Sequence, residues 1–239
     1  MDTPVLSTMV VLYTTNVVVD TTKLAHELPL NDHICKIEKR GVVKRGESKR
    51  DKIKRRSKKE TPSTTGFCHN SLTIVVLNDG DGTHPRKEIT VKLFQNGVFH
   101  MTGILDEAYD RSVIRILLDT IATCKDSRKT TDELQILQRR VVLMNYTTKL
   151  SSNTTVAREA LHTAIRTCGD EHVSSQYDPD VYPGVKIAIG SGKWTAKIFR
   201  TGKIILTGVV SHDECRELTS QLLALFAKVL PKKQMLSAM

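Results

Sequence analysis

The strongest constraint on the fold of this chain is an internal repeat. The segment Phe94-Gln-Asn-Gly-Val-Phe-His-Met-Thr-Gly103 is matched, at an offset of 105 residues, by Phe199-Arg-Thr-Gly-Lys-Ile-Ile-Leu-Thr-Gly208. Each copy follows strand-like alternation and leads into an acidic helix start and a long apolar-periodic helix, predicted over 106–123 and 212–229. A repeat at this spacing predicts two copies of one structural unit.

The start of each copy is marked by a second match, Tyr13-Thr-Thr with Tyr146-Thr-Thr, at an offset of 133 residues. A short helix is predicted after each. The two offsets differ by 28 residues, about the size of a Lys/Arg-rich stretch that we place between the first helix and the second strand of the first copy. We therefore expect a first repeat over 1–127, with a basic insertion at 36–66, and a second repeat over 128–239.

Each repeat is predicted to run strand, short helix, three to four antiparallel strands, long helix, which is an α+β fold. Gly97 and Gly202 stand where a tight hairpin needs a positive φ. A sheet covered by helices on one face leaves its other face for a partner. Two pseudo-symmetric sheets joined side by side would give one continuous, curved antiparallel sheet with a concave open face.

The positive charge of the chain is confined to one segment. Residues 36–59 hold 13 Lys and Arg against three acids, which accounts for the whole net charge of +10, because the remaining 23 basic and 23 acidic residues balance. Three interpretations stay open: a phosphate-binding arm, a nuclear import signal and a solvated loop. The residues of this basic arm are Lys49, Arg50, Lys52, Lys54, Arg55, Arg56, Lys58 and Lys59.

The sequence carries no catalytic, cofactor or metal motif, and we expect a protein that is not an enzyme and needs no cofactor. Gly190-Ser-Gly-Lys193 lacks the Ser or Thr that a phosphate loop places after the lysine, so a turn between strands is expected there. The five cysteines contain no C-x-x-C pair, which favours free thiols in a reducing compartment. No apolar run is long enough to cross a membrane.

Three segments carry a family resemblance: Asp178-Pro-Asp-Val-Tyr-Pro-Gly184, Lys197-Ile-Phe-Arg-Thr-Gly-Lys-Ile-Ile-Leu-Thr-Gly208 and Leu143-Met-Asn-Tyr146. They resemble the TATA-binding protein family, most strongly in the second repeat. The basic run 55–59 followed by residues 66–71 is similar to divergent members encoded by nucleocytoplasmic large DNA viruses. The resemblance implies a saddle whose helices cover the convex face.

The family resemblance also implies a function, namely binding of A·T-rich promoter DNA through the minor groove. Such proteins insert apolar wedges between base steps and bend the duplex. The wedges implied here are Phe94, Tyr182 and Phe199. Asn145, Thr102 and Thr207 would hydrogen-bond to base acceptors, Pro183 and Ile205 would give apolar contact, and Lys92 and Lys197 would reach phosphates or acceptors in the narrow groove.

Some positions depart from the family pattern. Lys92 and Lys197 replace groove-facing leucines, and His100 replaces a valine. Asn70 aligns with the remaining wedge, where Phe67 substitutes only after a register shift, and Thr8 aligns with the second central asparagine. These changes predict DNA binding that is weaker, differently specific or dependent on a partner.

Two functional hypotheses follow. The first is a viral transcription initiation factor, likewise implied by the resemblance, that binds double-stranded promoter DNA and recruits a B-type initiation factor and the viral RNA polymerase. Asp178 and Asp180, which match the acidic loop of the family in sign and spacing, would contact that factor. The alternative is a saddle-shaped protein-interaction platform of the viral transcription machinery with weak or no sequence-specific DNA binding. In both cases we expect a monomer away from membranes, in the host nucleus or a cytoplasmic viral factory, with packaging in the virion as a further option.

Overall fold

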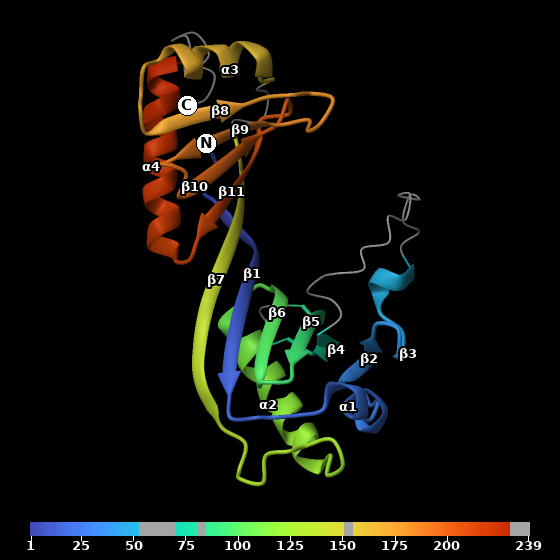
Figure 1. The fold of residues 1–239 in the computed structure, drawn as a ribbon. Helices are drawn as coiled ribbons and strands as arrows, with labels where there is room; N and C mark the ends of the chain where they lie inside the picture. The colour runs from blue at the N-terminus through green and yellow to red at the C-terminus, as the bar shows by residue number, and fades with distance from the viewer. Residues whose placement is uncertain (53–69, 81–84, 151–154, 230–239) are drawn as a thin grey trace. The chain divides into compact units, whose positions relative to one another are not determined.

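The structure is a computed structural model that describes residues 1–52, 70–80, 85–150 and 155–229. The chain forms two compact units, which we call the first-repeat unit (residues 9–142) and the second-repeat unit (residues 1–8 and 143–239). Two long strands, β1 (Val5–Thr15) and β7 (Ile136–Lys149), contribute residues to both units (Figure 1). The repeat boundary at residues 127 and 128 stays a prediction.

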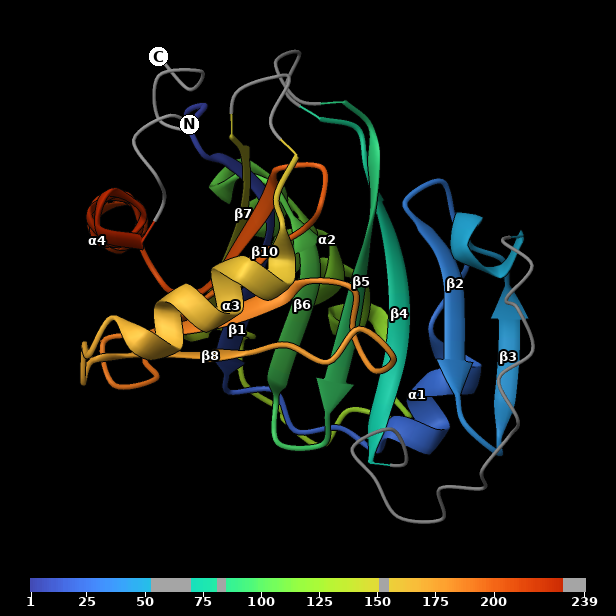
Figure 2. The same ribbon diagram turned by 90° about the horizontal axis from the view of Figure 1, so that it is seen from above.

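The first-repeat unit is an antiparallel sheet with strand order β3-β2-β4-β5-β6-β1-β7, and Figure 2 shows β3 at its outer edge. Its helices α1 and α2 contact the sheet through β2, β4 and β6. The elements after β1 are α1 (Thr21–Glu27), β2 (Ile34–Lys39), β3 (Val43–Gly46), the short 3-10 helix η1 (Lys49–Lys52), β4 (Ser71–Asn78), β5 (Lys87–Phe94), β6 (Val98–Ile104) and α2 (Glu107–Thr123).

The second-repeat unit has the same plan with strand order β7-β11-β10-β9-β8. Four antiparallel strands follow its short helix, at the upper limit of the prediction. The α+β class with two repeats is thereby confirmed. The elements after β7 are α3 (Arg158–Thr167), β8 (Val173–Gln176), β9 (Val185–Ile189), β10 (Trp194–Ile198), β11 (Lys203–Val209) and α4 (His212–Val229).

Alternation along the strands decides which sheet face is covered. In β9, the buried residues Val185, Ile187 and Ile189 alternate with half-buried Lys186 and Ala188. Because successive strand side chains point to opposite faces, the apolar set packs under the helices and the polar set lies on the other face. The same alternation runs through β5, β6, β10 and β11. Each unit thus has one face covered by α-helices and one face that no α-helix of the described residues covers, which we call the helix-free face.

The predicted hairpin glycines are confirmed. Gly97 and Gly202 both have a φ of 75°, a conformation that residues with a Cβ adopt only at a cost. At Gly97 space is a second constraint, because a Cβ would lie 2.3 Å from the carbonyl oxygen of Val17. Gly190 and Gly192 are also left-handed, in the turn between β9 and β10, where the sequence predicted a turn.

The predicted equivalence of Tyr13 and Tyr146 at the start of the two repeats is wrong, because the structural alignment is displaced by two residues. In the first-repeat unit Met101 pairs with Val11, whereas its repeat equivalent Leu206 pairs with Tyr146. Val11, not Tyr13, is therefore the structural counterpart of Tyr146, and the offset is 135 residues. A shift of two keeps every side chain on the same sheet face, which is why the alternation pattern could not detect it. The counterpart of Asn145 is accordingly Val10 rather than Thr8.

The predicted insertion at residues 36–66 is also wrong at its start. Lys36 and Lys39 belong to β2, which pairs with β4 in the sheet. The chain then turns at Gly41, with φ 75°, and returns as the edge strand β3. The high charge of this segment hid the two strands, because the sequence could not show that Lys36, Lys39 and Arg45 are bound by neighbouring groups. Between its short and its long helix, the described part of the first-repeat unit thus has five strands, one more than the four of the second.

Candidate nucleic-acid interface

The helix-free face of the second-repeat unit is rich in lysine. Strand register places Lys186, Lys197, Ile205 and Thr147 in one row across β9, β10, β11 and β7. Next to this row, Lys203 pairs with Lys149 and Thr195 pairs with Thr207. Asn145 lies on the same face of β7, alternating with the buried residues 144 and 146. The segments of these four strands in this unit therefore present four lysines and no acidic residue on this face.

An aromatic pair lies at one end of this face. The rings of Tyr182 and Phe199 have centroids 5.9 Å apart and are tilted by 58°. Both rings lie against the backbone of Gly184, where a Cβ would be 3.1 Å from Cε1 of Tyr182 and 3.3 Å from Cε1 of Phe199. The glycine after Tyr-Pro therefore lets the two rings pack closely on the end of the sheet. The structure thus brings these two predicted wedges together.

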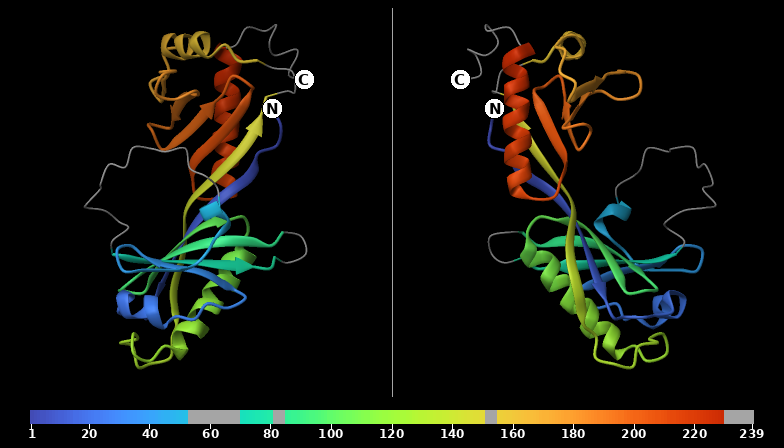
Figure 3. Two further views of the ribbon diagram at one scale, coloured as in Figure 1. Left: turned by 90° about the vertical axis from the view of Figure 1, so that its right-hand side faces the viewer. Right: turned by 60° about the vertical axis from the view of Figure 1, so that its left-hand side comes forward.

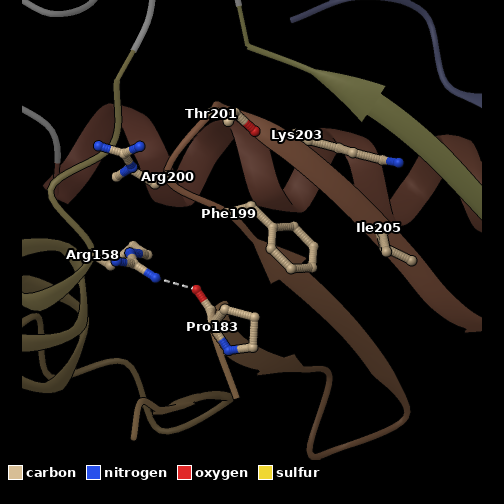
Figure 4. A pocket seen from close by; sticks show the side chains of 7 residues that line it. All are labelled: Arg158, Pro183, Phe199, Arg200, Thr201, Lys203 and Ile205. Carbon is tan, nitrogen blue, oxygen red and sulfur yellow. Dashed lines mark hydrogen bonds between the residues drawn. The ribbon is translucent and has the colours of Figure 1, made fainter. Parts of the chain in front are cut away.

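Phe199 also lines a pocket of about 400 Å³ (Figure 4). Its walls combine apolar groups from Phe199, Pro183 and Ile205 with the basic side chain of Lys203. Arg158 from α3 donates a hydrogen bond to the carbonyl oxygen of Pro183 and closes one side. Three residues predicted from the sequence thus share one site, but the basic groups around them were missed. The basic residues of this pocket and of the helix-free face that were not predicted from the sequence are Lys149, Arg158, Lys186, Arg200 and Lys203.

The alternation of β9 and β11 could have revealed the missed lysines. Lys186 and Lys203 each stand beside a buried strand position and belong to the polar set. A period-two pattern places such residues on the helix-free face. Arg158, by contrast, comes from a helix, and only the tertiary structure places it beside Pro183.

The helix-free face of the first-repeat unit carries the remaining predicted residues. Lys92 and Phe94 on β5 and Thr102 on β6 are half-buried on this face, alternating with buried neighbours. Lys92 pairs with His100 across the two strands. Burial, and then the charge of Lys92, hold the pKa of His100 below its ordinary value. Phe94 is the repeat equivalent of Phe199, and it pairs with Ser71, whereas the β9–β10 register places Gly184 opposite Phe199. Asn70, one residue before Ser71, therefore corresponds to Pro183 and not to Tyr182.

Part of this face in the first-repeat unit is covered by the chain itself. Figure 3 shows η1 on the side of the sheet away from α1 and α2. The ammonium of Lys36 on β2 lies 3.0 Å from Oδ1 of Asp51 in η1, and the backbone N–H of Lys49 donates to the Glu88 carboxylate on β5 at 2.9 Å. Val75 on β4, the cross-strand partner of Lys36, is only 5% exposed. We call residues 47–52 the covering segment.

Several basic residues of the charged segment have structural partners. Arg45 on β3 donates to the carbonyl oxygens of Ala25, His26 and Leu28, which caps the C-terminus of α1. Lys39 is buried and donates to the hydroxyl of Thr21 at 2.9 Å. Lys49 of the predicted arm is exposed. The side chains of Arg50 and Lys52, and residues Lys54, Arg55, Arg56, Lys58 and Lys59, lie outside what the structure describes.

The turn between β8 and β9 carries the predicted partner-binding carboxylates. Asp178 and Asp180 are both exposed. Asp178 organises the turn, because its carbonyl oxygen accepts from Tyr182 and its carboxylate accepts from the N–H of Asp180 at 3.0 Å. Val181 beside them is 79% exposed. The turn thus presents two carboxylates and an apolar side chain on the surface.

Comparisons with known proteins agree with this geometry. Residues 155–229 match the family described as "Transcription factor TFIID (or TATA-binding protein, TBP)". The chain is 44% identical over 51 residues to TATA-box-binding protein 2 of Entamoeba histolytica, covering 21% of this chain and 24% of that protein. It is 46% identical over 39 residues to the TATA-box-binding protein of Sulfolobus acidocaldarius, covering 16% and 20%. The matches thus span about a quarter or less of these relatives' length.

The fold comparison extends over nearly the whole chain. Methanococcus jannaschii TBP matches with a TM-score of 0.59 at 14% identity, covering 95% of this chain and 100% of that one. The fold and the matched segment define a protein of the two-repeat, sheet-and-helix class to which the TATA-binding proteins belong. The chain is similar to the TATA-binding proteins in sequence over residues 155–229 and in fold over nearly its whole length. This likeness agrees with the expectation that the chain is not an enzyme.

Three further findings concern the described residues alone. No group of three or more His, Cys, Asp or Glu side chains in this part of the chain is arranged to hold a metal ion. No helix within 1–52, 70–80, 85–150 and 155–229 is long and apolar enough to span a membrane. Cys35, Cys124, Cys168 and Cys215 are free thiols.

Proposed function

We propose that this chain is a transcription initiation factor that binds promoter DNA through its helix-free sheet faces, with the second-repeat unit making the main contacts. The observation that carries the proposal is the open face of that unit, where lysines surround the Tyr182–Phe199 pair and the apolar pocket of Ile205 and Pro183. Lysines attract the phosphate backbone, and apolar side chains enter between base steps in the minor groove.

The polar residues proposed to contact bases are consistent with this role. Thr102 and Thr207 precede Gly103 and Gly208, whose φ values are 90° and 93°, at bulges in equivalent strands of the two units. Asn145 adds an amide on the helix-free face. Amide and hydroxyl groups can bind the acceptors that A·T pairs present in the minor groove. A preference for A·T-rich duplex follows from this set of groups.

The proposed protein partners are a B-type initiation factor and an RNA polymerase. The exposed turn of Asp178, Asp180 and Val181 supports this part of the proposal, because it offers charge and an apolar contact without involving the DNA-facing strands. We propose that the protein acts as a monomer in a viral setting, in the nucleus or a cytoplasmic viral factory.

A second candidate is a protein-interaction platform of the transcription machinery that binds DNA weakly or without sequence preference. The covering segment favours it, because Asp51 and Lys36 close part of the first-repeat face that DNA would otherwise contact. Lys92 and His100 favour it too, since they place polar groups where an apolar contact would be needed.

The deciding experiment is a fluorescence-anisotropy titration with A·T-rich and G·C-rich duplexes at two salt concentrations. The wild type is compared with a variant in which Lys54, Arg55, Arg56, Lys58 and Lys59 are all changed to Gln. Substitution is preferable to deletion from residue 39, which would remove β3 and the Arg45 cap of α1. Tighter binding to A·T duplex that survives these substitutions supports the initiation factor. Binding that disappears with them, or that ignores base composition, supports the platform.

A further inference from the structure

Two lysines flank one aromatic ring on the second-repeat face. Lys186 on β9 and Lys197 on β10 are directly opposite each other in the strand register. The ammonium of Lys186 lies 5.4 Å from the centroid of the Tyr182 ring, and that of Lys197 lies 5.8 Å from the same centroid. Both contacts are within the range of a cation–π interaction. The Tyr182 ring thus contacts the ammonium groups of two lysines on this face and the ring of Phe199.

These two ammonium groups have no carboxylate partner among the described residues. The ion pairs of the second-repeat unit use other lysines, Lys193 with Glu214 and Lys228 with Asp170. Like charges directly opposite each other on a sheet destabilise it. An anion bound near both ammonium groups would remove that cost, and a partly buried site strengthens the attraction.

We propose that Lys186, Lys197 and Tyr182 form a binding site for one phosphate group of duplex DNA. This inference rests on the proposed function and deepens it. The two ammonium groups would bind the phosphate oxygens together, while the Tyr182 ring holds the lysine side chains in place. Phe199, whose ring lines the apolar pocket with Ile205, would then be the side chain that enters the base step.

The proposal predicts a specific salt dependence. Each phosphate contact that is lost reduces the slope of log affinity against log salt by about 0.9. If both lysines share one phosphate, the double variant K186M/K197M loses a slope of about 0.9. If they bind two separate phosphates, it loses about twice that value.

The experiment measures duplex affinity at four or more salt concentrations for wild type, K186M, K197M and the double variant. Bending of a fluorophore-labelled duplex is measured in parallel by energy transfer. The matched control is Lys193→Met, because Lys193 also lies over an aromatic ring, at 4.5 Å from the Trp194 centroid, but is already paired with Glu214. The double variant Lys186→Arg with Lys197→Arg keeps both charges and should keep the wild-type slope.

The expected result is that K186M/K197M reduces the slope by about 0.9 with the bend angle retained, while Lys193→Met leaves the slope unchanged. An unchanged slope in a double variant that still binds duplex overturns the phosphate site and leaves the proposed function standing. A reduction of about 1.8 overturns the shared site in favour of two phosphates. A wild type that binds no duplex overturns the proposed function itself. Inorganic phosphate at constant ionic strength should compete only weakly, since the backbone of the duplex supplies the other contacts.

Discussion

The ammonium of Lys36 and the carboxylate of Asp51 form an ion pair at 3.0 Å that holds the covering segment on the helix-free face of the first-repeat unit. Lys36 is only 7% exposed, and its ammonium also contacts Glu38. The N–H of Ser48, and then Lys36, hold the pKa of Asp51 well below its ordinary value, so the pair is charged at any physiological pH. The face that pseudo-symmetry would offer to DNA is therefore partly occupied by the chain's own residues.

Breaking this pair should expose the face. We expect Asp51→Ala to tighten duplex binding by about threefold or more at low salt, because Lys36 and Lys44 lose a carboxylate partner and become available to phosphates. Glu47→Ala is the matched control, since it removes the same charge from the same exposed segment. Equal gains in the two variants, measured by anisotropy, would attribute the effect to net charge rather than to the covering segment.

The two predicted wedges Phe199 and Phe94 should differ in importance. We expect Phe199→Ala to weaken binding to A·T-rich duplex about tenfold, equivalent to about 1.4 kcal/mol, and to reduce its bend. Phe94→Ala should cost about twofold, because the second-repeat unit keeps more of the groove-contacting set. Anisotropy and energy-transfer bending measure both variants. Equal losses would argue against the leading role of the second repeat.

Gly184 should be required for the aromatic pair. Its φ lies outside the left-handed region, so Gly184→Ala strains no backbone angle, but the new Cβ would press on Tyr182 and Phe199. We expect about a fivefold loss of duplex affinity with a change of less than about 1 kcal/mol in the free energy of unfolding, since the rings can shift outward and the unfolded chain loses entropy. Ring-to-ring nuclear Overhauser effects report the displacement. Displaced rings with unchanged affinity would remove the pair from the binding site.

A buried charge network stabilises the first-repeat unit. Asp110 on α2 is fully buried and accepts from the Tyr13 hydroxyl and from Nε of Arg139, both at 2.7 Å. Burial, and then the bond to Asp110, raise the pKa of Tyr13, so the phenol stays protonated. We expect Asp110→Leu to lower the free energy of unfolding by about 3–5 kcal/mol, because Tyr13 loses its buried acceptor and Arg139 keeps only its ion pair with Glu107.

Chemical denaturation measures this loss. Asp119→Leu is the control on the same helix, since Asp119 is exposed and surface substitutions usually change stability by less than about 0.5 kcal/mol. Similar losses at the two positions would show that helix propensity, rather than the network, sets the cost.

The stability of the first-repeat unit should depend on the protonation of His100. Its pKa in the folded protein is lowered by burial and by Lys92, so the unfolded chain binds the proton more readily. The free energy of unfolding should therefore fall as pH drops below about 6.5, the ordinary histidine pKa, until the folded-state pKa is passed. His100→Gln should flatten that part of the profile, measured by denaturation between pH 7.5 and 5. An identical profile in the variant would assign the pH dependence to other groups.

The sequence alone determined the repeat plan, the α+β class and both long helices. Apolar periodicity and the glycines of the hairpins specify these features within each segment. They can therefore be predicted without knowing which other segments of the chain pack against it. Through the family resemblance, the sequence also named Tyr182, Phe199 and Pro183 among the predicted DNA-contacting residues. The Tyr13–Tyr146 match failed because a register shift of two residues changes the partner of a side chain without changing its face.

Tertiary structure alone decided where the charges of the chain act. Sequence counting made residues 36–59 a single basic arm, but Lys36, Lys39 and Arg45 are bound by a carboxylate, a hydroxyl and helix-terminal carbonyls. The tertiary structure also placed Arg158 next to Pro183 and Lys186 opposite Lys197. A hydrophobic pattern fixes local structure because burial acts on each residue separately. A charged side chain's role depends on the groups within a few ångströms of it, and only the folded chain brings those groups together.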